Sequence, residues 1–299
     1  MSAPSASIVI PVWDRPSTLG RAIRSVLSQT RGDLEVIVVD NGSADAAAVQ
    51  RVIDEAKDDR VRLVRLGGNT GPSGGRNAGV AASSARLIGF LDSDDEFEPE
   101  WFEEMSAPFD DPGCSVVTCG YRIFHADGRI DPPANPEPLS PAFHGVCARF
   151  QAGTMLIRRD AFDAAGGFDP VLWFGENTDL GLSLTAQQPA PSFHSVPRAL
   201  LRWHHWPKAP YAPELRMASA QRTLERHAGA MSRDPQLRRS YLAVAGVSAA
   251  RAGQRATARR CFAQLARDER SLRAVARWVV ALTPLTSRLV WGRQRGTNS

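Results

Sequence analysis

Three aspartates within four positions, Asp92, Asp94 and Asp95, directly follow the apolar run Leu87–Leu91. Carboxylates this close together repel one another unless a cation lies between them. Hard divalent cations take oxygen ligands, and ions of the Mg²⁺ type usually bind one or two carboxylates together with substrate phosphates. An Asp-x-Asp pattern alone is expected about once by chance in such a chain. The interpretation therefore depends on the position of the pattern at the end of a predicted strand. The cluster indicates a metal that holds a phosphorylated substrate.

Two further segments carry groups suited to a nucleotide. Asp40 ends the apolar run Leu34–Asp40, and it either accepts a hydrogen bond from a ribose or base or caps the next helix. The glycine-rich stretch 67–79 leads into a helix N-terminus, where free backbone N–H groups attract phosphate, and Arg76 adds a fixed cation. Read alone, this stretch is equally compatible with a structural turn.

Two more segments offer acid–base or metal-binding groups. Glu176 and Asp179 lie three residues apart at a predicted helix start, where one acts as a general base or both only favour the helix dipole. His204 follows the apolar run 196–201, and its imidazole could bind a metal, bind phosphate or serve structure alone.

The elements that must position these groups alternate along the first part of the chain. Strands are predicted over 7–12, 34–40, 61–66 and 86–91, and helices over 16–29, 44–56, a segment ending at 83, and 100–108. This alternation indicates right-handed crossovers and a mostly parallel sheet flanked by helices, an α/β fold. Beyond it we expect a hairpin over 116–130, a return to the sheet over 147–158, and helices over 160–165 and 178–187.

From Pro213 onward the pattern is helical, over 213–229, 235–251, 254–267 and 269–282. We therefore expect a catalytic domain over 1–212 and a basic helical C-terminal extension over 213–299. Residues 232–299 hold 14 Arg against three acids, a net charge of +11 in a chain whose total is +4. This extension either lies on an anionic membrane surface or packs as a helical subdomain with a solvated arginine face.

Composition places the chain in a broad class. With 43% hydrophobic residues it supports a large core. Residues 1–7 lack the basic and apolar parts of a signal peptide, and no apolar run reaches the length of a membrane span. The four cysteines form no CxxC pair, which favours free thiols in a reducing compartment. We expect a cytoplasmic protein, with peripheral contact at the inner face of the cell membrane as a further option.

Five motifs then occur together in a familiar order. They are Ser7–Arg15, Ser25–Thr30, Glu35–Ser43, Arg76–Gly79 and Phe90–Asp95. In order and spacing the chain resembles the family 2 inverting glycosyltransferases with the GT-A fold, over about residues 5–205. The resemblance implies a nucleotide-diphosphate sugar donor, a divalent metal (Mg²⁺ or Mn²⁺), and transfer of one sugar to a glycan, lipid-linked or small-molecule acceptor. It implies no nucleic-acid partner.

The resemblance also implies roles for matched positions. Those that would surround the nucleotide sugar are Pro11, Asp14, Arg15, Asp40, Arg76, Asp92 and Ser93. Among them, the Pro11 backbone and Asp40 would hold the nucleobase. Asp94 would ligate the metal that bridges the diphosphate, with Asp95 as a second ligand or a support and His204 as a further candidate ligand.

The expected general base is where the chain departs from the family. The family commonly places an Asp after a Glu at the segment that matches Glu176 and Asn177, and an asparagine cannot take a proton. The base is then Glu176, which we favour, or Asp179. The alternative is a non-catalytic nucleotide-sugar-binding or scaffold protein of the same fold. A nucleotidyltransferase would need a glycine-rich loop after the first strand, where Pro11–Pro16 stands instead.

Overall fold

The computed structural model describes residues 4–205 and 212–269 of the 299-residue chain. The described residues form two compact units, which are treated separately below. The first comprises residues 4–139, 143–170 and 176–205, and the second comprises 140–142, 171–175 and 212–269. The short segment Val171–Gly175 therefore belongs with the C-terminal helices, although it precedes them by some forty residues in the chain.

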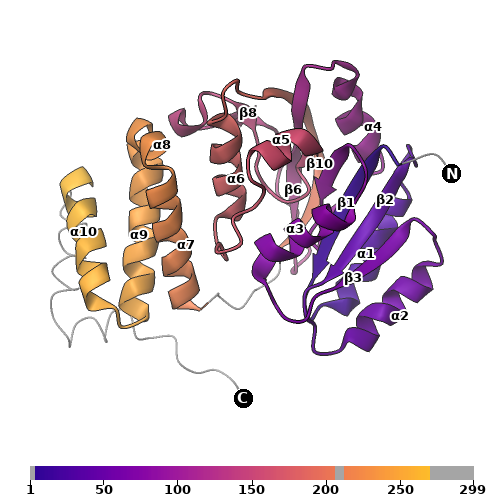
Figure 1. Ribbon diagram of the computed structural model, residues 1–299, viewed down its shortest axis with the longest axis horizontal. Coiled ribbons are helices and arrows are strands. Elements are labelled where there is room, and N and C mark those ends of the chain that lie inside the picture. Colours follow the sequence, from indigo (N-terminus) through magenta and orange to yellow (C-terminus); the bar gives the residue numbers. More distant parts are fainter. Residues whose placement is uncertain (1–3, 206–211, 270–299) are drawn as a thin grey trace. The chain divides into compact units, whose positions relative to one another are not determined.

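The first unit is a sheet flanked by helices (Figure 1). Its main strands are β1 (Ala6–Val12), β2 (Leu34–Asp40), β3 (Val61–Arg65), β4 (Leu87–Phe90), β5 (Glu96–Phe97), β6 (Cys114–His125), β9 (Met155–Arg158) and β10 (Ser192–His205). Its α-helices are α1 (Pro16–Leu27), α2 (Ala46–Ala56), α3 (Gly71–Ala82), α4 (Trp101–Ser106), α5 (Arg159–Ala164) and α6 (Glu176–Thr185). Two short strands, β7 (Glu137–Pro138) and β8 (Cys147–Ala148), pair only with each other, and a 3-10 turn covers Ala107–Asp110. A second 3-10 turn, Pro141–Phe143, has two of its three residues in the second unit.

The eight main strands follow the order β3-β2-β1-β4-β9-β6-β10-β5. β3, β2, β1 and β4 run parallel, as the alternation of strands and helices predicts. β9 inserts antiparallel between β4 and β6, and β5 pairs antiparallel with β10. The sheet is thus mostly parallel with two reversed strands, which confirms the predicted α/β class.

Several predicted elements shift in detail. Helix α3 begins at Gly71, inside the predicted glycine-rich loop, because Pro72 at its first turn fits the helical φ angle. The long strand β10 has no predicted counterpart, since Pro197 interrupts its apolar pattern and it pairs with β6 through three register shifts. The predicted hairpin is present at its tip, where Phe124 and Ile130 form an antiparallel bridge.

Two apolar layers cover the two faces of the sheet. Helices α1, α2 and α4 bury Leu19, Val49 and Trp101 against one face. Helices α3, α5 and α6 bury Val80, Phe162 and Leu180 against the other, together with Val9, Val39 and Phe90 of the strands. Helices on both faces hide the sheet from water and leave the strand ends as the place where polar groups meet a ligand.

Helix α3 lies unusually close to the sheet because it presents glycines to it. A Cβ atom added at Gly79 would lie 2.2 Å from Cγ1 of Val9, and one at Gly75 would lie 3.2 Å from Cβ of Pro11. Only glycine permits such an approach of helix to strand. Gly75 and Gly79 therefore allow α3 to pack directly against β1.

The second unit is helical. Its helices are α7 (Pro213–Arg226), α8 (Ala228–Arg233), α9 (Pro235–Arg251) and α10 (Arg255–Glu269). The predicted helix over 213–229 is thus divided near His227, and the predicted helix over 269–282 lies outside the described residues apart from Glu269. Met217, Leu242 and Phe262 form its core, and a Cβ at Gly246 would lie 2.7 Å from the Phe262 ring.

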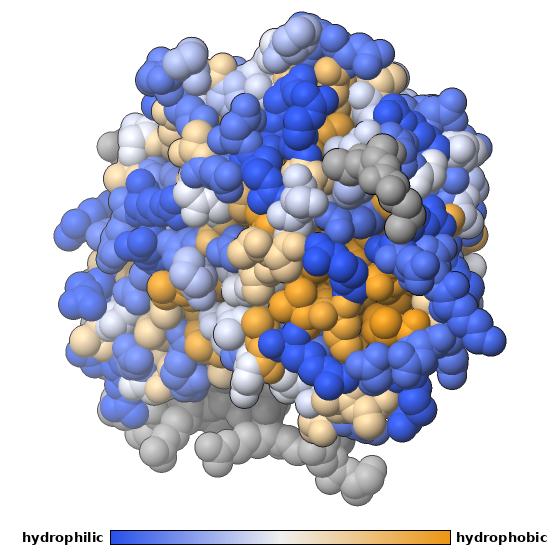
Figure 2. Space-filling model, turned by 45° about the vertical axis from the view of Figure 1, so that its right-hand side comes forward, coloured by the Kyte–Doolittle hydropathy of each residue, from blue (hydrophilic) through white to orange (hydrophobic). Residues whose placement is uncertain are grey.

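The surface is mainly polar. On the face drawn in Figure 2, hydrophilic residues predominate and hydrophobic ones show between them. Of the large apolar side chains in the described ranges, Trp13, Ile130 and Val171 are exposed by half or slightly more. No helix among the described residues is both long enough and apolar enough to span a bilayer.

We predict that Gly79→Ala destabilises the fold by about 1–2 kcal/mol, because the new methyl group overpacks against Val9. This loss outweighs the roughly 1 kcal/mol that Ala gains over Gly inside a helix. Urea unfolding followed by circular dichroism measures the difference. The matched control is Gly67→Ala, where no atom lies within 4 Å of the added Cβ; equal stability of the two variants would contradict the packing explanation.

Candidate active site

The predicted site residues of the first unit gather at one edge of the sheet. Strands β1, β2 and β4 are parallel, and Val12 of β1 lies in register with Asp40 of β2. Asp14 and Arg15 follow β1, Asp40 ends β2, and Asp92 and Ser93 come two and three residues after β4. Their common edge is the carboxyl end of the parallel strands, the usual ligand site of such sheets.

The carboxylate cluster is compact. Asp92, Asp94 and Asp95 each offer one oxygen atom, and these oxygens lie within 4.8 Å of one another. Within the described ranges this is the one group of three or more His, Cys, Asp or Glu side chains placed to share a metal ion. Asp94 and Asp95 are buried, whereas the Asp92 side chain is about one-third exposed. Three hard oxygen donors with one open side fit Mg²⁺ or Mn²⁺ well.

Two arginines contact Asp94, and one of them pairs with its carboxylate. Nη1 of Arg15 lies 2.5 Å from Oδ2 of Asp94, and Nη2 of Arg21 donates to the Asp94 backbone oxygen at 2.8 Å. Arg15 remains 40% exposed, so its side chain has room to move toward solvent. Arg15 therefore supplies, in this structure, the positive charge that a bound cation would supply.

His204 lies beside this cluster but is oriented away from it. Its Nε2 lies 2.7 Å from Oε1 of Glu96, and its backbone N–H donates to Oδ1 of Asp95 at 2.8 Å. Burial and the nearby charge of Arg21 lower the pKa of the His204 imidazole. The neutral ring thus donates Nε2–H to Glu96, and a metal-binding role for His204 stays a prediction.

Arg76 connects the cluster to helix α6. Its Nη2 lies 2.7 Å from Oδ1 of Asp92 and its Nη1 lies 3.1 Å from Oε1 of Glu176, while its side chain is only 3% exposed. Its guanidinium also lies over the ring of Phe168, 5.3 Å from the centroid. Burial alone would lower the pKa of Arg76, but the charges of Asp92 and Glu176 raise it above the usual value. Arg76 is therefore a permanent buried cation shared by two carboxylates.

The two candidate bases differ in accessibility. Glu176 is the first residue of α6, and its side chain is 13% exposed. Asp179, one turn later, has no exposed surface. Asn177 is partly exposed next to Glu176. Of the two acids, Glu176 alone reaches the surface of the site.

Asp40 and Asp14 organise the loops after their strands. Oδ1 of Asp40 accepts from the Ser43 backbone N–H at 2.9 Å, and Oδ1 of Asp14 accepts from that of Ala44 at 2.7 Å. The alternative role of Asp40 as helix cap is wrong, because Asp45 caps α2 by accepting from Ala48 N–H. Asp40 is buried, and one of its two oxygens forms this turn contact.

Sequence reasoning missed two residues at this edge. Asn41 ties the ends of β2 and α3 together: its Oδ1 accepts from Thr70 at 3.0 Å and its Nδ2 donates to the Gly71 carbonyl at 2.9 Å. Trp13 follows β1 and is half exposed. A large aromatic residue between a buried strand and a polar loop is a signal that could have identified Trp13 from the sequence.

Comparison with known proteins agrees with this geometry. Residues 7–164, just over half of the chain, match the family model described as glycosyl transferase family 2. The succinoglycan biosynthesis protein ExoO of Rhizobium meliloti is 37% identical over 126 residues, which cover 42% of this chain and 36% of that protein. The uncharacterized glycosyltransferase EpsJ of Bacillus subtilis is 28% identical over 192 residues, covering 60% of this chain and 56% of that protein.

The solved structure of S. aureus TarS 1-349 in complex with UDP-GlcNAc superposes with a TM-score of 0.62 at 16% identity, covering 95% of this chain and 86% of that one. This likeness confirms the predicted GT-A fold. The chain spans about a third of ExoO and just over half of EpsJ.

We predict that Arg76→Gln destabilises the protein by about 2–4 kcal/mol, because it leaves two partly buried carboxylates without their shared cation. Urea unfolding without added metal measures the change. Arg51→Gln is the control, since Arg51 is 64% exposed and its single ion pair, with Asp45, is 3.7 Å long; it should shift stability by less than about 0.5 kcal/mol. A similar small shift for Arg76→Gln would mean that the pairs do not support the fold.

Proposed function

Because the chain belongs to glycosyl transferase family 2, we propose that it moves one sugar from a nucleotide-diphosphate sugar to an acceptor hydroxyl, with inversion at the anomeric carbon. One observation carries this proposal. The metal-capable carboxylates after β4 and the accessible carboxylate of Glu176 lie on the two sides of a single buried cation, Arg76. This arrangement would hold the donor-binding groups and the base close together.

The donor would bind across the strand ends. Asp40 and the Pro11 backbone would hold the nucleobase, and the exposed ring of Trp13 provides an aromatic face beside them. Asp94, with Asp92 or Asp95, would hold a divalent cation, Mg²⁺ or Mn²⁺. That cation, when bound, supplies Lewis-acid neutralisation of charge on the departing nucleoside diphosphate. Arg15 pairs with Asp94 in this structure and is 40% exposed. If it left Asp94, its guanidinium would be available to the diphosphate.

Glu176 would act as the general base. Inversion by one displacement requires a base that deprotonates the acceptor hydroxyl on the face opposite the leaving group. Asp179 has no exposed surface, so it is poorly placed to contact an acceptor, whereas Glu176 is accessible and oriented by Arg76. The ion pair with Arg76, 3.1 Å long, would hold the Glu176 carboxylate in one orientation.

The acceptor would be a polysaccharide-type glycan or its lipid-linked precursor. The support is the name of the relative ExoO, which refers to succinoglycan biosynthesis. The basic extension from residue 213 would then meet anionic lipid at the cytoplasmic face of the membrane. Arg251, Arg255 and Arg260 of α9 and α10 are exposed, and such clusters are attracted to anionic headgroups.

A second candidate function is nucleotide-sugar binding without transfer. The observation that favours it is Asn177, an amide at the position where the family commonly has a carboxylate. Turnover separates the two functions. A thermal-shift screen of nucleotide sugars with Mn²⁺ identifies the donor, and transfer or slow hydrolysis of that donor supports the enzyme.

We predict that Asp94→Ala weakens the Mn²⁺-dependent part of UDP-sugar binding by about 100-fold or more, since even outer-shell substitutions cost about 10–100-fold in metal affinity. Calorimetric titration with Mn²⁺ and with EDTA separates the metal-dependent part from the rest. Asp59→Ala, at an exposed aspartate before β3, is the control. Unchanged affinity of Asp94→Ala in Mn²⁺ would remove Asp94 from the metal site.

We predict that Glu176→Gln keeps donor affinity and lowers the transfer rate by about 10²–10⁴-fold, the usual contribution of general acid–base catalysis. The amide keeps the size of the side chain but accepts no proton. Steady-state transfer and donor titration measure the two effects, with the exposed Glu55→Gln on α2 as control. Full activity of Glu176→Gln would exclude Glu176 as the base.

A further inference from the structure

A concave site lies along helix α1, lined by none of the residues predicted to hold the donor. It has a volume of about 490 Å³, within the range of small-molecule pockets. Its walls are the outer face of α1 from Arg21 to Ser28, the turn before β3 with Arg60, and strand β5 together with Arg202 of β10. We refer to this site as the α1 groove. None of the residues assigned above to the donor, the metal or the base lines it, although the matched motif Ser25–Thr30 does.

Three of the four arginines in the α1 groove are held by carboxylates. The pairs are Arg21 with Glu96 at 3.1 Å, Arg60 with Asp58 at 2.8 Å, and Arg202 with Glu98 at 2.8 Å. Each arginine side chain remains between 31% and 40% exposed. Their guanidinium groups are thus fixed in direction but still accessible, which reduces the ordering entropy that a ligand must overcome.

The fourth arginine, Arg24, is different. It is exposed on α1 between Arg21 and Ser28, and no described carboxylate forms an ion pair with it. The groove therefore carries one positive charge beyond those its carboxylates balance. The exposed Ser28, which caps the C-terminal end of α1, follows four residues after Arg24.

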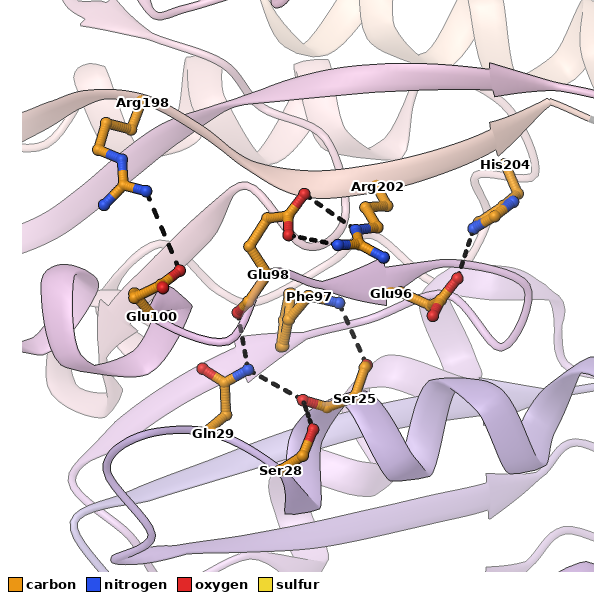
Figure 3. A network of polar contacts seen from close by, with 10 residues as sticks. All are labelled: Ser25, Ser28, Gln29, Glu96, Phe97, Glu98, Glu100, Arg198, Arg202 and His204. Carbon is orange, nitrogen blue, oxygen red and sulfur yellow. Dashed lines mark hydrogen bonds and ion pairs between the residues drawn. The ribbon is translucent and has the colours of Figure 1, made fainter. Parts of the chain in front are cut away.

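The floor of the α1 groove is rigid (Figure 3). Oγ of Ser25 accepts from the Phe97 backbone N–H at 3.1 Å, and Nε2 of Gln29 donates to the Glu98 carbonyl at 2.9 Å. Oε1 of Gln29 in turn accepts from Phe102 N–H at 2.8 Å. Buried side chains of α1 and of the residues just after it thus bond this segment to residues 97–98 and to α4, so the groove exists before any ligand arrives.

We propose that the α1 groove binds a saccharide that carries an anionic group, a carboxylate or a phosphate, at Arg24. Arginine forks match the planar geometry of oxyanions, and the neighbouring paired arginines and Ser28 provide further donors for ring hydroxyls. The volume accommodates one or two sugar rings rather than a free inorganic ion. This binding does not depend on transfer at the donor site.

The test is titration of the full chain with glucuronic acid, glucose 6-phosphate and glucose, observed by ligand NMR. We expect at least one anionic sugar to bind and glucose not to bind, with affinity falling as salt rises. Excess UDP with Mn²⁺ should leave the bound anionic sugar in place. Preference for the carboxylate or the phosphate sugar identifies the anionic group.

Arg24→Gln should weaken binding of the anionic sugar by about tenfold, the size of one charge-assisted hydrogen bond. Arg51→Gln, at an exposed arginine on α2 outside the groove, should leave it unchanged. Thermal unfolding of both variants confirms that they fold like the parent chain. Any of three results would overturn the proposal: no anionic sugar binds, UDP displaces it, or Arg24→Gln binds it as tightly as the parent.

Discussion

The guanidinium of Arg76 lies between Asp92, which follows β4, and Glu176, which begins α6. Removing a cation from water costs several kcal/mol unless well-placed anions compensate it. Here two carboxylates and the face of Phe168 do so. Each of the three contacts offsets part of the cost of burying Arg76. Two ion pairs to one shared cation therefore connect Glu176 to the carboxylate cluster.

This arrangement in turn depends on how closely α3 approaches the sheet. Gly75 and Gly79 flank Arg76, and both face β-strand side chains that leave no space for a Cβ without displacement. Asn77 on the same helix holds the Phe168 segment by two hydrogen bonds, from its Nδ2 to the Phe168 carbonyl at 2.7 Å and from Phe168 N–H to its Oδ1 at 3.1 Å. The short glycine-containing segment at 75–79 thus sets the distance between α3 and the sheet. It also positions the Phe168 segment and the buried Arg76.

The elements that the sequence predicts well are those whose signal is local. β1, β2 and β4 are short apolar runs bounded by turn residues, and their parallel order follows from the helices between them. β10 was missed because Pro197 and its register shifts break the local pattern, so its length depends on pairing with β6. The reversed direction of β9 is likewise a property of the sheet rather than of the four residues Met155–Arg158.

The same distinction applies to the site. The carboxylate cluster is contiguous in sequence, so its proximity could be predicted. The pairing of Arg76 with Glu176 joins residues one hundred positions apart, and the pairing of His204 with Glu96 joins residues 108 apart. No sequence pattern determines such partners. The matched family motifs predicted Arg76 near a nucleotide, whereas the fold gives it two protein carboxylates.

The outer strand β3 has a consequence for how copies of this protein behave in a crowded solution. β3 lies at one end of the sheet and leaves a row of backbone groups open to another chain. It carries two exposed arginines. The Arg62 side chain donates to Glu35, and the Arg65 side chain donates to Gln50. Charged side chains on an edge strand disfavour edge-to-edge strand pairing between molecules, which is the first step of many aggregates.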